Sequence, residues 1–454
     1  MTDRQMTTMT LTAERTYLAV PVYLYDESMD RTERVRFDHL RLFYVKDASG
    51  RIIFRFVTSW KEDMTKDPDY VSCLNIGAWR GQRLTIETEQ PKAFLDHIAQ
   101  TDHQVYSYAA LKGEEDTGAE DPARPQLHYT APVGWINDPN GLVYQNGVWH
   151  LFYQHNPMNV EWANMSWGHA VSDDLLHFHY VDDIMFPDDN GAMFSGCGLV
   201  NERGCFGLPK DALLFFYTAS QDPTRLVPGV VNTQRLAFST DNGKTIQKFE
   251  GWHLPNLGGD NRDPKIFWHE ETKSYVMVLF LQGKSFAILR SADLEEWEIT
   301  QKMDYDPMWE CPDLVRLRAD DGGEKWAFLS ADGYYYLGSF DGYVFTPETG
   351  LLHLFEGEEK LPYAGQTYSN TDERVIQIAW LRIPNRGTNY TGTLSLPREL
   401  SLGRDETGYY IRQSFAAEAL PYEEKLPDGS VRIRDSYIQE TISPEGRYCT
   451  VRLI

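Results

Sequence analysis

The chain has 454 residues, 42% of them hydrophobic and 24% charged, and this globular composition excludes wholesale disorder. Acidic residues outnumber basic ones by 67 to 43, so the net charge of −24 argues against nucleic acid and anionic membrane surfaces as partners. Aromatic residues make up 13% of the chain, which favours β structure and a surface on which a ligand can stack. A sugar fits this charge better than a nucleotide does.

The cysteines and the N-terminus bear on the cellular compartment. Five cysteines without a C-x-x-C pair do not make a disulfide scaffold, a zinc ribbon or a thioredoxin-type site. The N-terminal segment lacks the basic stretch, apolar run and cleavage site of a signal peptide. No apolar run approaches the roughly 18 residues of a membrane span. We therefore expect a cytoplasmic protein, or a secreted one if a signal was trimmed from the N-terminus.

Residues 1–111 are expected to form a small accessory module that resembles a β-sandwich. Alternating or apolar β-type runs fill it, with a helical stretch near residues 91–101. The β-type runs cover residues 16–25, 35–45, 51–60 and 83–89. Residues 112–125 are acidic and rich in Gly and Pro, and they are expected to be a linker.

Residues 126–402 carry a repeated pattern. Their short β runs end in a Ser-x-Asp turn, which begins at Ser172, Ser239, Ser291 and Ser339, at spacings of 67, 52 and 48 residues. Ser-x-Asp turns are common, but their recurrence near 50 residues favours the blades of a β-propeller over a sandwich. A hairpin turning at Asn146-Gly147 belongs to the first blade, and the run after Arg374 provides a fifth. The fold class predicted is therefore all-β, with a five-bladed β-propeller.

Residues 403–454 contain short β-like fragments and are expected to form a partial C-terminal β module. They are too few for a second full sandwich. The final TVRLI reads as part of a strand, so a truncated module is expected.

Two aspartates precede a proline at the start of a predicted blade. Asp138 lies in Trp-Ile-Asn-Asp-Pro-Asn-Gly, where Pro139 favours an extended Asp138 and Asn-Gly turns the chain. Asp263 lies in Asn-Arg-Asp-Pro and opens the next such run. Each motif alone is a common turn or surface feature. A rigid position is also what a nucleophilic carboxylate needs.

A third acid, Glu310, lies between Trp309 and Cys311. This apolar setting is expected to raise its pKa and keep it protonated, although an ordinary strand-edge glutamate is the plainer interpretation. Glycoside hydrolysis needs two carboxyl groups on either side of the scissile bond. A propeller gathers the starts of its inner strands around one axis, so acids from different blades can meet there.

These three motifs, WINDPNG, NRDPK and WECPDL, resemble in order and context the signatures of glycoside hydrolase family 32, the invertases, inulinases and levanases. Further similar stretches, including FYQHNP, FSGC and LSLPREL, extend the resemblance over about residues 127–402. The chain departs from the family pattern at Leu361-Pro362, where an Asp-Phe is usual, and this leaves subsite details open.

The resemblance implies a retaining glycoside hydrolase that removes terminal β-D-fructofuranosyl units from sucrose, inulin or levan, a β-fructofuranosidase or fructan β-fructosidase. Asp138 would be the nucleophile, Glu310 the general acid and then base, and Asp263 with Arg262 would stabilise the transition state. A covalent intermediate requires the two reacting carboxyl groups to lie about 5–5.5 Å apart. The substrate-binding residues implied are Asn137, Gln154, Trp162, Phe194, Ser195, Arg262 and Trp380.

Two other functions stay open at this point. A fructosyltransferase would use the same site and pass fructose to a sugar instead of water. A non-catalytic sugar-binding propeller would be expected to have lost at least one of the three acids. The partner is a small or oligosaccharide fructoside, no cofactor or metal is implied, and the oligomeric state and the role of the N-terminal module are not determined by the sequence.

Overall fold

The structure is a computed structural model that describes residues 5–24, 39–61, 63–114, 121–221, 226–357 and 359–454. Within these residues nearly all regular elements are strands, which confirms the all-β prediction. Residues 35–38 of one expected β run and residues 115–120 of the expected linker lie outside this range. In the part of the chain described, no helix is long and apolar enough to cross a membrane.

Residues 5–111, here called the N-terminal module, contain two antiparallel sheets. One has the order β1 (Thr7–Thr12), β6 (Arg83–Thr88), β3 (Leu40–Lys46) and β4 (Ile52–Ser59). The other has the order β5 (Tyr70–Asn75), β2 (Tyr17–Val22) and β7 (Ala99–Thr101). The sheets share a core that includes Phe43, Phe56, Tyr70 and Phe94. Short helical turns are η1 (Gly77–Trp79), α2 (Lys92–Leu95) and α3 (Tyr108–Leu111).

The helical stretch expected near residues 91–101 is shorter than predicted. Only α2 is helical there, and β7 follows it because residues 99–101 pair with β2. This tertiary pairing overrides the local helical preference.

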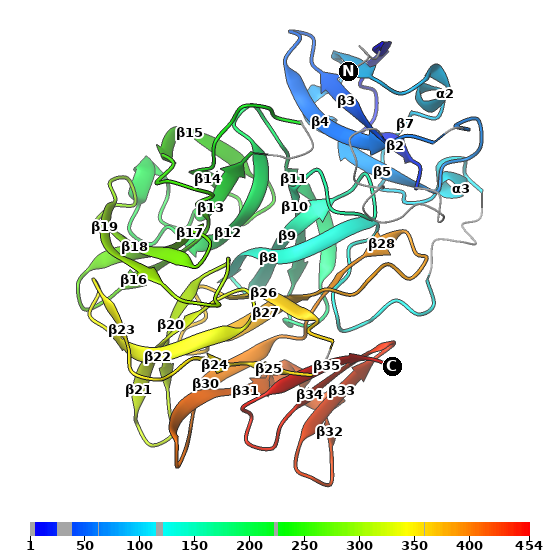
Figure 1. The fold of residues 1–454 in the computed structure, drawn as a ribbon. Coiled ribbons are helices and arrows are strands. Elements are labelled where there is room, and N and C mark those ends of the chain that lie inside the picture. Colours follow the sequence, from blue (N-terminus) through cyan, green and yellow to red (C-terminus); the bar gives the residue numbers. More distant parts are fainter. Residues whose placement is uncertain (1–4, 25–38, 62, 115–120, 222–225, 358) are drawn as a thin grey trace.

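Five successive sheets follow, numbered here sheet 1 to sheet 5 (Figure 1). Sheet 1 has β8 (Gly134–Gln145), β9 (Val148–Asn156), β10 (Ser166–Ser172), β11 (His179–Met185) and, parallel to β8, β28 (Tyr390–Thr391). Sheet 2 has β12 (Ala192–Val200), β13 (Leu213–Ser220), β14 (Thr233–Ser239) and β15 (Gln247–Leu254), with η2 (Cys205–Gly207) after β12. Sheet 3 has β16 (Arg262–His269), β17 (Ser274–Gln282), β18 (Ser285–Ser291) and β19 (Glu298–Asp304).

The last two of these sheets are less regular. Sheet 4 has β20 (Asp313–Arg318), β21 (Glu324–Leu329), β22 (Tyr334–Phe340), β23 (Phe345–Pro347) and β24 (Leu352–His353). Sheet 5 has β26 (Pro362–Thr367), β27 (Ile376–Leu381), β29 (Thr393–Leu394), β30 (Arg398–Asp405) and β31 (Gly408–Phe415). The first strands of sheets 5, 1, 2 and 3 are neighbours in that order: β26 packs against β8, β8 against β12, and β12 against β16.

The repeated Ser-x-Asp pattern marks the same turn in successive sheets. Ser172, Ser239 and Ser291 each end a third strand and donate to the aspartate two residues later, at 2.8, 2.7 and 3.1 Å. The predicted hairpin is also confirmed: Gln145 pairs with Val148 across Asn146-Gly147, whose φ angles are 51° and 81°.

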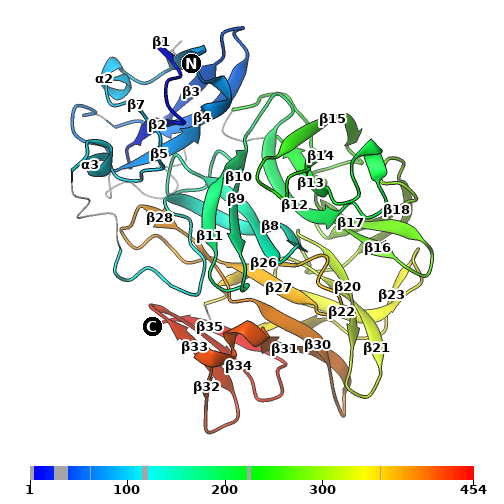
Figure 2. The same ribbon diagram turned by 180° about the vertical axis from the view of Figure 1, so that it is seen from behind.

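The C-terminal residues form a further sheet, which lies next to sheets 4 and 5 (Figure 2). Its order is β25 (Phe355–Glu356), β35 (Cys449–Leu453), β34 (Ile438–Ile442), β33 (Val431–Asp435) and β32 (Glu424–Lys425), with η3 (Ala417–Tyr422) before it. The boundary expected between residues 402 and 403 lies inside β30, and β31 continues sheet 5 to residue 415. Apart from β25, the strands of the C-terminal sheet therefore all follow residue 415.

A buried ionic cluster joins the segment before β8 of sheet 1 to the C-terminal sheet. His128 Nδ1 lies 2.9 Å from Asp435 and its Nε2 lies 3.1 Å from Glu440. Burial alone would lower the pKa of His128, but hydrogen bonds to the two carboxylates raise it to about 9. Burial opposes the charge of Asp435 and Glu440, yet hydrogen bonds from His128 hold both pKa values below their ordinary range.

Replacing His128 with Gln should destabilise the fold in a pH-dependent manner. The pKa of His128 is higher folded than in the unfolded chain, where it is about 6.5, so its stabilisation is complete below about pH 6.5 and is lost as the pH rises through about 9. Thermal unfolding of both proteins by circular dichroism should show a Tm difference that shrinks over this range. The control is His177→Gln, because His177 also pairs with an aspartate, Asp174, but is exposed. A Tm difference independent of pH would contradict the prediction.

Candidate active site

The first strands of four sheets each carry a break in pairing register. These shifts lie in β8, β12, β16 and β26, and the shifted stretches contain Asp138, Ser195, Asp263 and Ala364 respectively. A bulge of this kind bends the strand and redirects a side chain that regular alternation would place elsewhere. The repeated bulges therefore turn polar side chains of different sheets toward one region.

Three residues of this region have backbone conformations that side chains disfavour. The φ angles are 61° at Asp263, 47° at Glu310 and 39° at Cys311. Left-handed conformations of non-glycine residues cost on the order of 1 kcal/mol or more and cluster at functional sites. For Glu310 and Cys311, this geometry lies immediately before β20, where no regular strand pairing constrains the chain.

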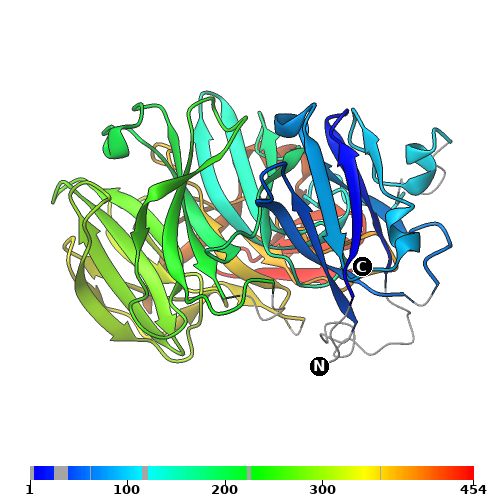
Figure 3. The ribbon, with the colours of Figure 1, turned by 90° about the horizontal axis from the view of Figure 1, so that it is seen from above.

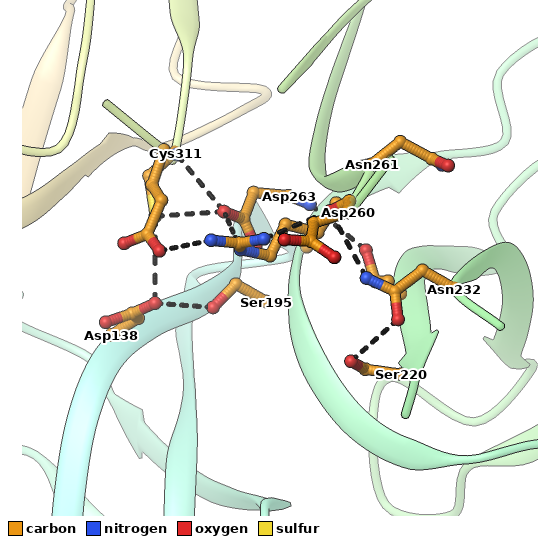
Figure 4. A network of polar contacts seen from close by, with 12 residues as sticks. Asp138, Ser195, Ser220, Asn232, Asp260, Asn261, Asp263 and Cys311 are labelled. Atoms are coloured by element: carbon orange, nitrogen blue, oxygen red, sulfur yellow. Dashed lines mark hydrogen bonds and ion pairs between the residues drawn. The ribbon is translucent and has the colours of Figure 1, made fainter. Parts of the chain in front are cut away.

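The side chains of Asp138, Asp263 and Cys311 point toward one another (Figure 4). The Cys311 thiol lies 3.7 Å from Asp138 Oδ2 and 3.6 Å from Asp263 Oδ2, and the Cys311 backbone N–H donates to Asp263 at 3.2 Å. Asp138 also accepts hydrogen bonds from Ser195 Oγ at 2.6 Å and from Asn137 Nδ2 at 3.1 Å. Residues from sheets 1, 2 and 3 and from the turn before sheet 4 thus meet around two carboxylates.

Glu310 has polar partners. Arg262 forms an ion pair with Glu310 Oε1, and the Tyr363 hydroxyl donates to Glu310 Oε2 at 2.6 Å. Trp309, which was expected to shield Glu310, is 42% exposed and packs on Phe280 with ring centroids 5.4 Å apart. The apolar setting predicted for Glu310 is therefore wrong, because the turn before β20 separates the two side chains.

The electrostatics of the cluster favour retention of a proton. Burial raises the pKa of Asp138, as does the charge of Glu310, while the hydrogen bonds from Ser195 and Asn137 oppose the shift. Burial also raises the pKa of Asp263, against the charge of Arg262 and in concert with the other two acids. Three carboxyl groups around one guanidinium cannot all ionise cheaply in a buried site.

Aromatic rings form one wall beside the acids. Trp135, Trp162, Phe194 and Trp380 belong to one apolar cluster. Trp162 meets Phe194 edge-on with centroids 6.1 Å apart, and Trp135 meets Trp380 at 5.7 Å. Three of the four are partly exposed, and such rings offer faces to a sugar.

Gln154 lies beneath this surface. Its side chain is 2% exposed, and its Nε2 donates to the Asn140 amide oxygen at 3.0 Å when that amide is oriented to satisfy its neighbours. The same orientation lets Asn140 donate to Ser195 at 3.3 Å. Gln154 therefore supports the strand that carries Asp138.

A second buried cluster holds the inner strands together. Lys265 of β16 pairs with Asp313 of β20 at 3.5 Å and donates to Thr367 Oγ1 of β26 at 2.9 Å. Asp313 in turn accepts from the Thr367 hydroxyl at 2.8 Å. These bonds join sheets 3, 4 and 5, so the bulged strands have a rigid base.

All residues singled out from the sequence lie in this one region. The acids, Arg262, Asn137 and Ser195 share the polar network, whereas Trp162, Phe194 and Trp380 share the aromatic wall. Sequence reasoning missed Tyr363, and also Thr218, whose hydroxyl accepts from the Asp263 N–H at 3.0 Å. Tyr363 lies on β26, ahead of the run after Arg374 that predicted the fifth blade, so the repeat pattern gave no signal for it.

The arrangement combines acid, base and nucleophile candidates with a stacking surface for an uncharged ligand. Within the described ranges, no group of three or more His, Cys, Asp or Glu side chains is arranged to hold a metal ion.

Comparison with known proteins gives an independent result. The family model "Glycosyl hydrolases family 32 N-terminal domain" matches residues 128–414. The levanase of Bacillus subtilis (strain 168) is 33% identical over 326 residues, covering 64% of this chain and 46% of the levanase. The invertase of Debaryomyces hansenii is 32% identical over 327 residues, covering 66% of this chain and 60% of the invertase. The chain thus spans about half the length of these curated relatives.

Solved structures agree in fold. The exo-inulinase of Aspergillus awamori superposes with a TM-score of 0.65 at 21% identity, covering 74% of this chain and 94% of the other. The fructofuranosidase of Schwanniomyces occidentalis complexed with fructose gives a TM-score of 0.63 at 21% identity, covering 75% and 93%.

Proposed function

Since the chain belongs to glycoside hydrolase family 32, we propose that it is a retaining glycoside hydrolase that releases terminal β-D-fructofuranosyl units from sucrose or fructans. One observation carries the proposal: Asp138 of β8, Asp263 of β16 and Glu310 of the turn before β20 meet around Cys311 and Arg262. The names of the relatives supply the substrate class, because they are a levanase and an invertase.

In the first step Asp138 attacks the anomeric carbon C2, and the bond from C2 to the leaving oxygen breaks. Glu310 gives its proton to that oxygen, so the leaving sugar departs neutral and a fructosyl ester of Asp138 forms. In the second step Glu310 takes a proton from water, whose oxygen attacks C2 and displaces Asp138. Two displacements at one carbon give net retention.

Asp263 and Arg262 stabilise the transition state in this proposal. Positive charge develops on the furanose ring as the leaving group departs, and the buried carboxylate of Asp263 lies beside it. Arg262 stacks over Phe280 at 4.7 Å and pairs with Glu310, which holds the guanidinium in place. Interactions that strengthen only in the transition state lower the barrier.

The acidic cluster of the free enzyme retains a proton, and the first step needs a proton for the leaving oxygen. Because burial and mutual repulsion favour one protonated carboxyl in the cluster, a proton is present when substrate arrives.

We infer that sheets 1 to 5 are the five blades of a propeller. The first strands of sheets 1, 2 and 3 pack in succession, side-chain bonds join those of sheets 3, 4 and 5, and β26 of sheet 5 packs against β8 of sheet 1, so the end of the array returns to its beginning. A radial arrangement brings first strands of distant sheets to one axis.

Product analysis tests the proposed function. The chain is incubated with sucrose, inulin, levan and short fructo-oligosaccharides, and the products are separated by chromatography. Equal free fructose and glucose from sucrose support hydrolysis, whereas a large excess of glucose indicates transfer to sugar. Methanol added as acceptor should yield methyl β-D-fructofuranoside by NMR. Formation of the α-anomer would exclude retention, and no release from any substrate would exclude the function.

Replacing Tyr363 with Phe should lower kcat about tenfold with little change in KM, because the lost hydrogen bond orients Glu310 without holding the sugar. Burial and the charge of Glu310 raise the Tyr363 pKa, so the hydroxyl remains a donor at all working pH values. Initial rates on sucrose measure the effect. Tyr144, which packs on Trp149 away from the acids, provides the control Tyr144→Phe. A larger effect on KM than on kcat would contradict this role.

A further inference from the structure

The connection between β9 and β10 is buried, although connecting segments usually run over the surface. Every residue from 157 to 165 is buried except Trp162, which is partly exposed. The N-terminal module covers this connection. Figure 3 shows the blue strands of that module beside the cyan and green strands of sheets 1 and 2.

Asn164 makes the most specific of these contacts. Its Oδ1 accepts from the Val57 N–H at 2.7 Å, and its Nδ2 donates to the Val57 carbonyl at 2.8 Å. The amide thereby pairs with β4 in the way a neighbouring strand would. Nδ2 also donates to Asn156 Oδ1 at 2.9 Å, which ties the connection back to the end of β9.

Two further polar contacts hold the same segment. The Tyr70 hydroxyl donates to the Pro157 carbonyl at 3.1 Å, and Asn159 donates to the Ser59 hydroxyl. Tyr70 is fully buried and Asn159 is 4% exposed, so water competes with neither bond.

Apolar packing covers the remaining side chains of the connection. Met158 and Val160 belong to the core of the N-terminal module. Ala163 packs with Val57 of β4 in a smaller cluster that also contains Leu226 of the connection between β13 and β14. The connection is thus enclosed by the N-terminal module on one side and by sheets 1 and 2 on the other.

Trp162, the partly exposed residue of the β9–β10 connection, faces the proposed sugar site. It packs edge-on against Phe194, and the next residue, Ser195, donates to the proposed nucleophile Asp138. A displacement of the β9–β10 connection would therefore move an aromatic face beside the acids.

We propose that the N-terminal module is a structural part of the fructosyl pocket and that Asn164 is a positioning residue through which β4 fixes Trp162 against the sugar. This inference rests on the proposed function, because it assigns to the module a share in binding the same fructoside. Trp162 touches no reacting bond, so its displacement weakens ground-state and transition-state binding equally. Such uniform loss raises KM and leaves kcat unchanged.

The variant Asn164→Gly tests the proposal in the full chain. Asn164 has a φ of 52°, which glycine adopts without strain, so the change removes the side-chain bonds alone. We expect KM for sucrose to rise about tenfold and kcat to change less than about threefold. The matched control is Asn75→Ala, which removes a 2.8 Å bond from the same module to Asp182 on β11, away from the connection. Its KM and kcat should stay within about twofold of the parent values.

The outcomes separate the alternatives. If Asn164 has a purely structural role, Asn164→Gly should lower the folded fraction and therefore the apparent kcat, while KM stays constant. That result would overturn the inference. Equal KM increases in both variants would also overturn it. If Asn164→Gly does not fold, Tyr70→Phe replaces it, because that change removes only the hydrogen bond to Pro157. An unchanged KM in folded Tyr70→Phe would contradict the inference. Failure of the parent chain to act on any fructoside overturns the proposed function instead.

Discussion

Asp138→Asn is expected to abolish turnover while leaving sugar binding intact. The asparagine keeps the shape of the side chain, and its amide oxygen can still accept the hydrogen bond from Ser195. It cannot form the fructosyl ester on which both displacement steps depend. We expect kcat on sucrose to fall by at least about 10⁴-fold. Fructose binding, measured by calorimetry, should change little.

The chain offers a matched control for this substitution. Asp304 on the outer strand β19 accepts a hydrogen bond from Ser285 at 2.6 Å, the same distance as in the Ser195–Asp138 pair. Asp304→Asn makes the same chemical change far from the acids and should leave kcat unaltered. Substantial residual activity in Asp138→Asn would remove Asp138 from the nucleophilic role.

Glu310→Gln is expected to have the second largest effect. The amide can neither protonate the leaving oxygen nor activate water, so kcat/KM on sucrose should fall about 10²–10⁴-fold. The kcat/KM of the variant on an aryl β-fructofuranoside should fall less, because that leaving group needs little protonation. Azide needs no general base, and it should therefore accelerate the variant on the aryl substrate and yield β-fructofuranosyl azide.

The control for Glu310 is Glu298→Gln on the exposed side of β19, which should retain full activity and show no response to azide. Equal losses on sucrose and on the aryl substrate, without azide rescue, would contradict an acid–base role. In that event Glu310 would act through its ion pair with Arg262 alone.

Local sequence patterns predicted several features of the fold. The Asn146-Gly147 hairpin follows from turn chemistry that operates within a few residues. Three of the four predicted Ser-x-Asp turns end the third strand of a sheet, and in these three the serine hydroxyl donates to the aspartate two residues later. The fourth serine, Ser339, lies within β22. Where tertiary contacts competed with local preference, prediction failed: β7 replaced the expected helix, and sheet 5 extended beyond residue 402.

The candidate site shows the same division. The residue types and order of the motifs at Asp138, Asp263 and Glu310 identified the family and led to the proposed chemistry, because glycoside hydrolysis needs paired carboxyl groups whatever the fold around them. The surroundings of Glu310 were mispredicted, since its neighbours in sequence, Trp309 and Cys311, differ from its neighbours in space, Arg262 and Tyr363.

By itself the sequence determined the all-β class, the family and the order of the three acidic motifs, because these depend on residue types and short-range geometry. Only the tertiary structure decided which groups touch. It places the bulges of four separate strands side by side, raises the pKa values of Asp138 and Asp263 by burial, and pairs Asn164 with β4. Burial, charge coupling and hydrogen bonding act through space, so their sign and partners follow from packing and not from order along the chain.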